Sequence, residues 1–219
     1  MNQYIDHTLL LPSARTIEIN ALCKEAQANQ FFSVCVNPGF VNDCAKQLKG
    51  TNVKICTVIG FPLGTNTTEV KIFETQNAIM SGADEIDMVV NISDVLDSNW
   101  EKIEKEITAI KQACGPVLLK VIFETCLLNH EQIVELCKIC KRSGADYVKT
   151  STGFSTGGAT VEHIKLMRDT VGENMGVKAS GGIRSRETVQ AMIKAGASRI
   201  GASASVSIVS GETPATDGY

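Results

Sequence analysis

The chain has 219 residues, of which 43% are hydrophobic and 21% charged, and its formal net charge is −3. These values are typical of a soluble globular protein. Basic and acidic residues are mixed along the chain, which argues against a nucleic-acid or membrane surface, and no stretch approaches the roughly 20 apolar residues of a membrane span. The length suits one α/β barrel, which typically needs about 250 residues and can be built with about 200.

Short β-type runs alternate with longer helical patterns along the whole chain. The runs that predict strands are 4–7, 33–36, 54–59, 85–90, 117–122, 147–151, 176–179 and 199–202. The segments with helical periodicity are 13–28, 40–48, 67–80, 98–114, 129–142, 160–171, 185–194 and 204–209. Eight apolar strands, each followed by a helix, indicate a parallel sheet buried on both faces. We therefore predict a single (β/α)8 TIM barrel, because the alternative, an open doubly wound sheet, usually has six strands.

Local signals refine this picture. Capping boxes at Ser98 with Glu101 and at Asn129 with Gln132 predict the starts of the fourth and fifth helices. We expect residues 1–219 to form one domain, with 210–219 as a flexible C-terminal tail.

The eight cysteines stand in apolar contexts and indicate a reducing compartment. Cys137 and Cys140 lie on one face of a predicted helix, with no second cysteine pair or nearby histidine to complete a zinc set. We therefore expect them to pack in the core and predict no metal site. The N-terminus lacks a signal-peptide pattern, so we expect a cytoplasmic protein.

A faint internal repeat relates the starts of three predicted strands, at 81–87, 143–149 and 195–201. In each copy a glycine would end a helix before the chain turns into a strand. These are strands four, six and eight, and alternate strands of a barrel contribute to the same interior layer. Asp87, Lys149 and Gly201 would therefore be equivalent, with Gly201 leaving space beside the other two.

Four neighbouring predicted strands each carry a charged residue that a buried strand would normally exclude: Asp87, Lys120, Lys149 and Lys178. Charges are rarely buried without a partner or a task. Their convergence at the C-terminal rim of a barrel indicates amine chemistry on a carbonyl. The alternative is a set of buried ion pairs with Asp87 and Asp6, and for Lys120 electrostatic support and a purely structural role are equally good interpretations.

Lys149 and Lys178 lie near the ends of strands six and seven, and neighbouring strands are about 4.8 Å apart. A second cation and partial desolvation both disfavour a charged lysine, which leaves a neutral amine able to form a Schiff base with a carbonyl. The protonated Schiff base withdraws electrons, so an adjacent C–C bond can break. Asp87 would pair with a lysine or shuttle a proton.

Loops rich in glycine and serine follow the last three strands, at 152–158, 180–182 and 201–205. Such loops at helix N-termini bind anions, and barrels often hold phosphate after strands seven and eight. A phosphorylated substrate is therefore expected. His7 follows Asp6 and fits a supporting role and a core role equally well. Tyr219 lies at the C-terminus, where a flexible tail would let its hydroxyl fold over the barrel mouth.

With these residues in view, the sequence resembles the 2-deoxyribose-5-phosphate aldolase family, a family of class I (Schiff-base) aldolases with the barrel fold. The likeness covers essentially the whole chain, and the Lys-Thr-Ser-Thr-Gly run at 149–153 is highly specific. The other segments that carry the resemblance are 5–8, 34–38, 82–87, 119–125 and 177–183.

The resemblance implies that Lys149 forms the Schiff base, that Lys178 tunes it and transfers protons, and that Asp87 is the proton donor and acceptor. It implies reversible cleavage of 2-deoxy-D-ribose 5-phosphate to acetaldehyde and D-glyceraldehyde 3-phosphate, with no metal or organic cofactor and with a dimer or tetramer as the common assembly. It also implies supporting roles for Asp6, Lys120 and Tyr219, and a phosphate path along Gly153, Gly181, Gly182 and Ser203.

One departure concerns Phe154, which stands where some family members carry a lysine able to meet the phosphate. Three other functions fit the same residues. One is a Schiff-base lyase for a different sugar phosphate, and another is a phosphate-binding isomerase that uses Asp87 as acid or base. The third is a catalytically silent binding protein, which the intact set Asp87, Lys149 and Lys178 argues against.

Overall fold

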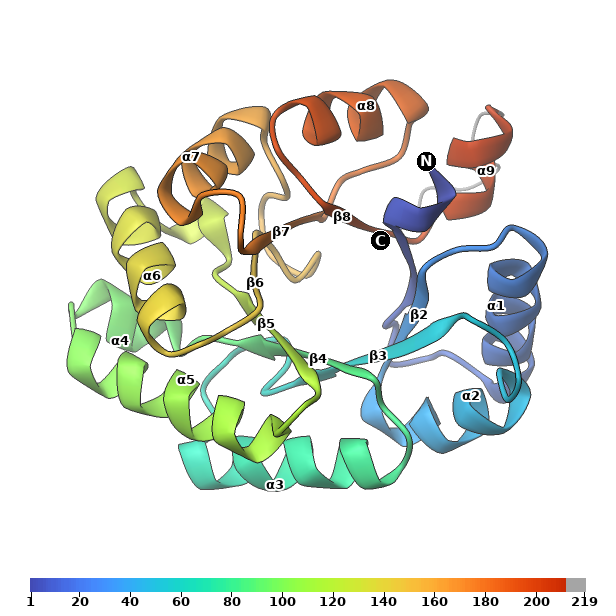
Figure 1. Cartoon of the computed structure of the whole chain (residues 1–219), viewed down its shortest axis with the longest axis horizontal. Helices are drawn as coiled ribbons and strands as arrows, with labels where there is room; N and C mark the ends of the chain where they lie inside the picture. Colours follow the sequence, from blue (N-terminus) through green and yellow to red (C-terminus); the bar gives the residue numbers. More distant parts are fainter. Residues whose placement is uncertain (212–219) are drawn as a thin grey trace.

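A computed structural model describes residues 1–211 as a closed barrel of parallel strands surrounded by helices (Figure 1). The strand order around the barrel follows the chain, and β8 pairs with β1. The fold is the predicted (β/α)8 barrel. Its strands are β1 (Ile5–Leu9), β2 (Ser33–Val36), β3 (Lys54–Ile59), β4 (Glu85–Val89), β5 (Leu118–Ile122), β6 (Tyr147–Lys149), β7 (Gly176–Ser180) and β8 (Arg199–Ala202).

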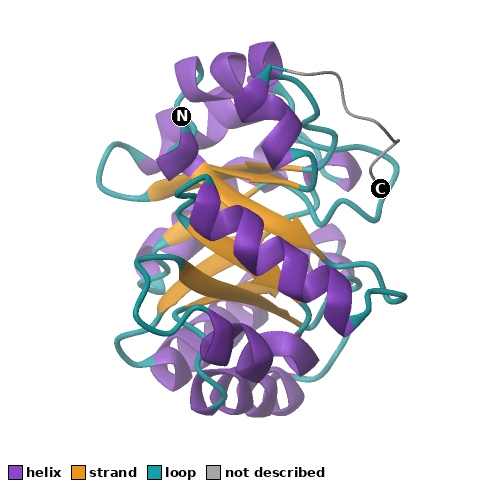
Figure 2. Cartoon of the chain, turned by 90° about the vertical axis from the view of Figure 1, so that its right-hand side faces the viewer, coloured by secondary structure: helices purple, strands orange, loops and turns teal. Residues whose placement is uncertain are grey.

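The helices lie outside the wall of strands, as Figure 2 shows from the side. Within residues 1–211, no helix combines the length and the apolar character needed to cross a membrane. The α-helices are α1 (Thr16–Ala28), α2 (Val41–Gln47), α3 (Thr68–Met80), α4 (Ile92–Leu96), α5 (Trp100–Cys114), α6 (His130–Arg142), α7 (Val161–Val171), α8 (Arg186–Lys194) and α9 (Ser205–Ser210). Short 3-10 helices span Asn2–Tyr4 (η1), Pro38–Phe40 (η2) and Thr125–Leu127 (η3).

The two predicted capping boxes have different outcomes. The box at Asn129 is confirmed, since its side chain accepts from the Gln132 N–H and the Gln132 side chain accepts from the Asn129 N–H. The box at Ser98 is wrong. The unpredicted helix α4 ends just before it, and Ser98 takes a left-handed conformation (φ 58°) in which its N–H bonds to the carbonyl of Val95. The cap position of α5 therefore falls on Asn99.

Alternate strands supply alternate layers of side chains to the barrel interior. The layer nearest the strand N-termini, contributed by β4, β6 and β8, holds Glu85, Tyr147 and Arg199. The layer above it, from the odd strands, holds Asp6, Cys56, Lys120 and Lys178. The next layer holds Asp87, Lys149 and Gly201, the residues that the internal repeat predicted to be equivalent. Charged groups thus fill an interior that most proteins fill with aliphatic side chains.

Outside the barrel interior, a buried ion pair ties α3 to α5 and β4. The ammonium of Lys71 lies 2.7 Å from the carboxylate of Glu106 and donates to the Val89 carbonyl at 2.9 Å. Burial lowers the pKa of Lys71, and Glu106 partly offsets this effect. Because breaking a buried pair leaves one charge without its partner, Glu106→Gln is expected to cost about 3 kcal/mol of unfolding free energy in urea at neutral pH.

A matched control for this prediction lies on the same helix, where exposed Glu101 pairs with Lys105 at 2.6 Å. Exposed pairs contribute little, so Glu101→Gln should change the unfolding free energy by less than about 1 kcal/mol. Equal effects of the two substitutions would contradict the importance assigned to burial of the Lys71–Glu106 pair.

Candidate active site

The three residues predicted to act in catalysis are in direct contact inside the barrel. The Nζ atoms of Lys149 and Lys178 both donate to Oδ2 of Asp87, at 2.7 and 2.8 Å. Lys120 donates to the other oxygen, Oδ1, at 2.7 Å. At most 3% of any of these four side chains is exposed. One carboxylate therefore contacts the terminal nitrogens of three lysines in an interior shielded from bulk water.

The pairing of β6 with β7 explains why the two rim lysines meet. Lys149 and Lys178 are direct register partners on these strands, and both side chains turn inward. Gly201 on β8 provides the room for Lys178, because a Cβ atom there would lie 3.2 Å from the Lys178 Cε. The space predicted from the internal repeat is therefore present, and Lys178 occupies it.

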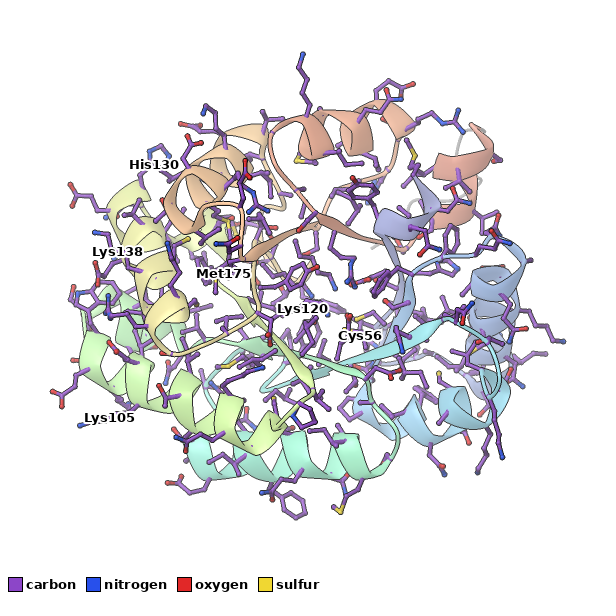
Figure 3. The ribbon with its side chains drawn as sticks, viewed as in Figure 1. Cys56, Lys105, Lys120, His130, Lys138 and Met175 are labelled. Carbon is purple, nitrogen blue, oxygen red and sulfur yellow. The ribbon has the colours of Figure 1, made fainter. Side chains whose placement is uncertain are left out.

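Asp6 joins this cluster to the layers below. Its carboxylate lies 2.5 Å from the ammonium of Lys178 and 2.8 Å from the guanidinium of Arg199, and it accepts from Ser33 at 2.7 Å. Lys120 also pairs with Glu85 at 2.5 Å, and Figure 3 shows Lys120 inside the barrel. Two of the three residues predicted to support the site, Asp6 and Lys120, therefore contact its charged groups.

The electrostatics of the cluster keep its carboxylates ionised. Burial alone would raise the pKa of Asp87, but Lys120, Lys149 and Lys178 together hold that pKa well below its ordinary value. For Asp6, burial is again opposed by cations, chiefly Lys178, and the pKa is lowered. Burial acts to lower the pKa of Lys178, yet Asp6 and Asp87 outweigh it and raise that pKa. Lys178 is therefore a stable ammonium group at neutral pH.

A cavity opens to solvent at the C-terminal end of the barrel, next to the charged cluster. Its wall includes Lys149. The four residues predicted to bind phosphate, Gly153, Gly181, Gly182 and Ser203, line the same cavity. The mouth also carries an aromatic contact, since the ring of Phe154 meets that of Phe61 edge to face at 5.4 Å.

Several residues at the site were not predicted. Glu85 and Arg199 are buried charges on strands, and the rule that identified Lys120 would have identified them too. Arg184 lines the cavity two positions after Gly182, and its closeness to the glycine-rich loop was the signal available in the sequence. Glu124 gave no such signal, because it lies beyond the end of β5. It is buried, and burial raises its pKa against the opposing effect of hydrogen bonds from Thr152.

One other candidate, His7, falls outside the site. His7 points away from the barrel interior, with its ring 5.2 Å from that of Phe31 and its Nε2 2.7 Å from the Glu25 carboxylate, which settles the open question in favour of the core role. Tyr219 lies outside the described residues. Cys137 and Cys140 are buried on the inner face of α6, as expected.

Among residues 1–211, two groups of buried side chains have the geometry to hold a metal ion: Cys35 with Cys56 and Asp87, and Cys56 with Asp6 and Glu85. Their carboxylates already contact the ammonium groups of Lys120 and Lys178 or the guanidinium of Arg199. A cation at either position would have to displace those charges.

The family model described as "DeoC/LacD family aldolase" matches residues 1–211, which is nearly the whole chain. The chain belongs to the DeoC/LacD family of aldolases. Curated relatives of this aldolase include "Deoxyribose-phosphate aldolase 1" of Vibrio vulnificus, 77% identical over the full length of both chains. A "Deoxyribose-phosphate aldolase" of Brevibacillus brevis is 59% identical over 100% of this chain and 99% of the relative.

Solved structures agree with this assignment. The aldolase superposes with a TM-score of 0.89 on a structure described as "Unique tetrameric structure of deoxyribose phosphate aldolase from Aeropyrum pernix". That protein is 35% identical, and the match covers 95% of this chain and 89% of that one. The barrel fold and the family assignment therefore agree, and both extend over nearly the whole chain.

Proposed function

We propose that this DeoC/LacD family aldolase cleaves 2-deoxy-D-ribose 5-phosphate reversibly to acetaldehyde and D-glyceraldehyde 3-phosphate through a Schiff base on Lys149. The observation that carries the proposal is the contact of Lys149 and Lys178 with one oxygen of Asp87 beneath a cavity lined by glycine-rich loops. The names of the curated relatives support the choice of substrate over other sugar phosphates.

The charge balance of the barrel interior supports Lys149 as the nucleophile. Four buried basic side chains, those of Lys120, Lys149, Lys178 and Arg199, face the three buried carboxylates of Asp6, Glu85 and Asp87. If Lys149 is neutral, three cations remain opposite three carboxylates, and a net buried charge is costly. Among the lysines, Lys149 also has the fewest carboxylate partners, since Lys120 and Lys178 each contact Asp87 and a second acidic group.

The reaction then follows from the positions of these groups. The neutral Lys149 amine attacks the C1 carbonyl of the open-chain sugar to give a carbinolamine. The carbinolamine takes up a proton from Lys178 or from water and loses water, which leaves a protonated Schiff base. Removal of the proton from the C3 hydroxyl, by Asp87 directly or through water, breaks the C2–C3 bond and releases glyceraldehyde 3-phosphate. The remaining two-carbon enamine is protonated at C2 by Asp87 or Lys178, and hydrolysis frees acetaldehyde. The Schiff base is the electron sink, so the proposed reaction uses no metal or organic cofactor.

The phosphate end of the substrate is assigned to the glycine-rich side of the cavity. Gly181 and Gly182 have left-handed backbone conformations (φ 83° and 73°), and such turns direct consecutive N–H groups toward an anion. Gly153 and Ser203 line the same wall, and Arg184 brings a positive charge to it. Arg184 thereby supplies a positive charge for the phosphate, in place of the lysine that some family members carry at the position of Phe154.

Reductive trapping tests the proposal directly. Borohydride reduction of the protein in the presence of acetaldehyde is expected to leave a two-carbon adduct on Lys149, identified by peptide mass mapping. Deoxyribose 5-phosphate cleavage is followed in parallel through release of acetaldehyde. A protein that cleaves the sugar phosphate without forming any lysine adduct would refute the Schiff-base mechanism, and an adduct without cleavage would favour a lyase for a different sugar phosphate.

We also propose a cytoplasmic location and a homo-oligomeric state for the enzyme. All eight cysteines, which lie within residues 1–211, carry free thiols, which supports a cytoplasmic location. Homo-oligomerisation as a dimer or tetramer is supported by the description of the Aeropyrum pernix relative as tetrameric.

A further inference from the structure

Glu124 has an unusual conformation and position for a residue outside the charged cluster. It follows β5 with a left-handed backbone (φ 57°, ψ 59°), which residues other than glycine rarely adopt and which often marks a functional position. Its side chain is buried, with only 2% of the residue exposed. The mechanism proposed above makes no use of this carboxylate.

Backbone hydrogen bonds hold Glu124 against the strand that carries the nucleophile. The N–H of Phe123, on one side of Glu124, donates to the Lys149 carbonyl at 3.0 Å. The N–H of Thr125, on the other side, donates to the Thr150 carbonyl, also at 3.0 Å. The left-handed turn between these two bonds directs the carboxylate across to the loop that follows β6.

The Glu124 carboxylate holds that loop with both oxygens. Oε1 accepts from the backbone N–H of Thr152 at 3.3 Å, and Oε2 accepts from the Thr152 hydroxyl. The same hydroxyl accepts from the N–H of Phe154 at 3.0 Å, so one chain of hydrogen bonds closes the turn at 152–154. Gly153, a proposed phosphate ligand, is the central residue of this turn, with a φ of 86°.

We propose that Glu124 is a positioning residue that fixes the 152–154 turn and thereby sets the affinity of the active site for the phosphate group of its substrate. The proposal rests on the proposed function for the identity of the sugar, and it deepens that function by assigning phosphate discrimination to a residue that does not touch the phosphate. Fixing a loop in its binding conformation raises affinity because the cost of ordering it is not incurred on binding.

The test compares a phosphorylated with an unphosphorylated substrate. Glu124→Gln is expected to lower the ratio of kcat/KM for 2-deoxyribose 5-phosphate to that for 2-deoxyribose by about tenfold or more, mainly through KM, as for loss of a hydrogen bond to a charged group. Thr152→Val, which removes the linking hydroxyl, should lower the same ratio, and Thr152→Ser, which keeps it, should restore most of it. Equal losses on both substrates, or an unchanged ratio, would overturn the proposal.

Calorimetric titration with inorganic phosphate separates this proposal from the proposed function. Weaker phosphate binding by Glu124→Gln and Thr152→Val than by the unaltered protein supports the role of the turn, whatever sugar is cleaved. Identical phosphate affinity in the three proteins contradicts it. If the unaltered protein binds phosphate but does not cleave 2-deoxyribose 5-phosphate, only the proposed function fails. Urea unfolding shows whether each variant is folded. If Glu124→Gln does not fold, the phosphate affinity of Thr152→Val decides the test.

Discussion

Replacing Lys149 with methionine is expected to abolish the borohydride-trapped adduct and to lower kcat/KM for 2-deoxyribose 5-phosphate by roughly 10⁴-fold or more, the scale of loss seen when a covalent nucleophile is removed. Methionine has a similar length but no amine, so no Schiff base forms. Asp87 retains its contacts with Lys120 and Lys178, so the charged cluster keeps its other ion pairs. The measurements are acetaldehyde release and peptide mass mapping after reduction.

Lys54→Met is the matched control. Lys54 also lies on a barrel strand, but half of its side chain is exposed, and its partner is Asp84 at 3.7 Å outside the charged cluster. Its replacement should leave both the adduct and the activity in place. An adduct that persists in Lys149→Met, on Lys120 or Lys178, would move the nucleophile to another residue of the cluster.

Much of the fold was predictable because barrel strands and their connecting helices leave strong local patterns. Every strand came from a short apolar run, and the repeat before Asp87, Lys149 and Gly201 correctly indicated one shared layer. The missed helix α4 has only five residues, and a segment of that length carries little periodicity. Its presence also explains the error at Ser98, whose sequence signal for a helix start was overridden by the turn that closes α4.

The active site was predictable to the extent that its chemistry requires charges on buried strands. Asp87, Lys120, Lys149 and Lys178 violate the composition of an ordinary strand, and that violation is visible in the sequence. Glu124 was not predictable, because its role depends on a left-handed turn that brings it to Thr152, a partner 28 positions away. Such contacts arise only when the barrel closes and the ends of β5 and β6 come together.

Lys178 offers the second large effect, because two of its properties can be separated by substitution. It remains charged, since Asp6 and Asp87 raise its pKa, and it lies beside Lys149 on the same oxygen of Asp87. Lys178→Met removes that neighbouring cation, and a neighbouring cation disfavours the charged form of an amine. We expect the pH for half-maximal trapping of acetaldehyde to rise, and kcat to fall by roughly 10²- to 10⁴-fold through loss of proton transfer.

Lys178→Arg distinguishes charge from proton transfer at the same position. The guanidinium keeps the positive charge but does not release a proton at neutral pH. If Lys178 acts on Lys149 through its charge, the arginine variant should keep the trapping pH of the unaltered protein while losing turnover as methionine does. A trapping pH that is unchanged in Lys178→Met would show that the second cation does not activate Lys149. The barrel interior holds one more basic side chain than carboxylates. If Lys178 does not activate Lys149, a different lysine would have to be the neutral one, and Lys120 is the remaining lysine in contact with Asp87.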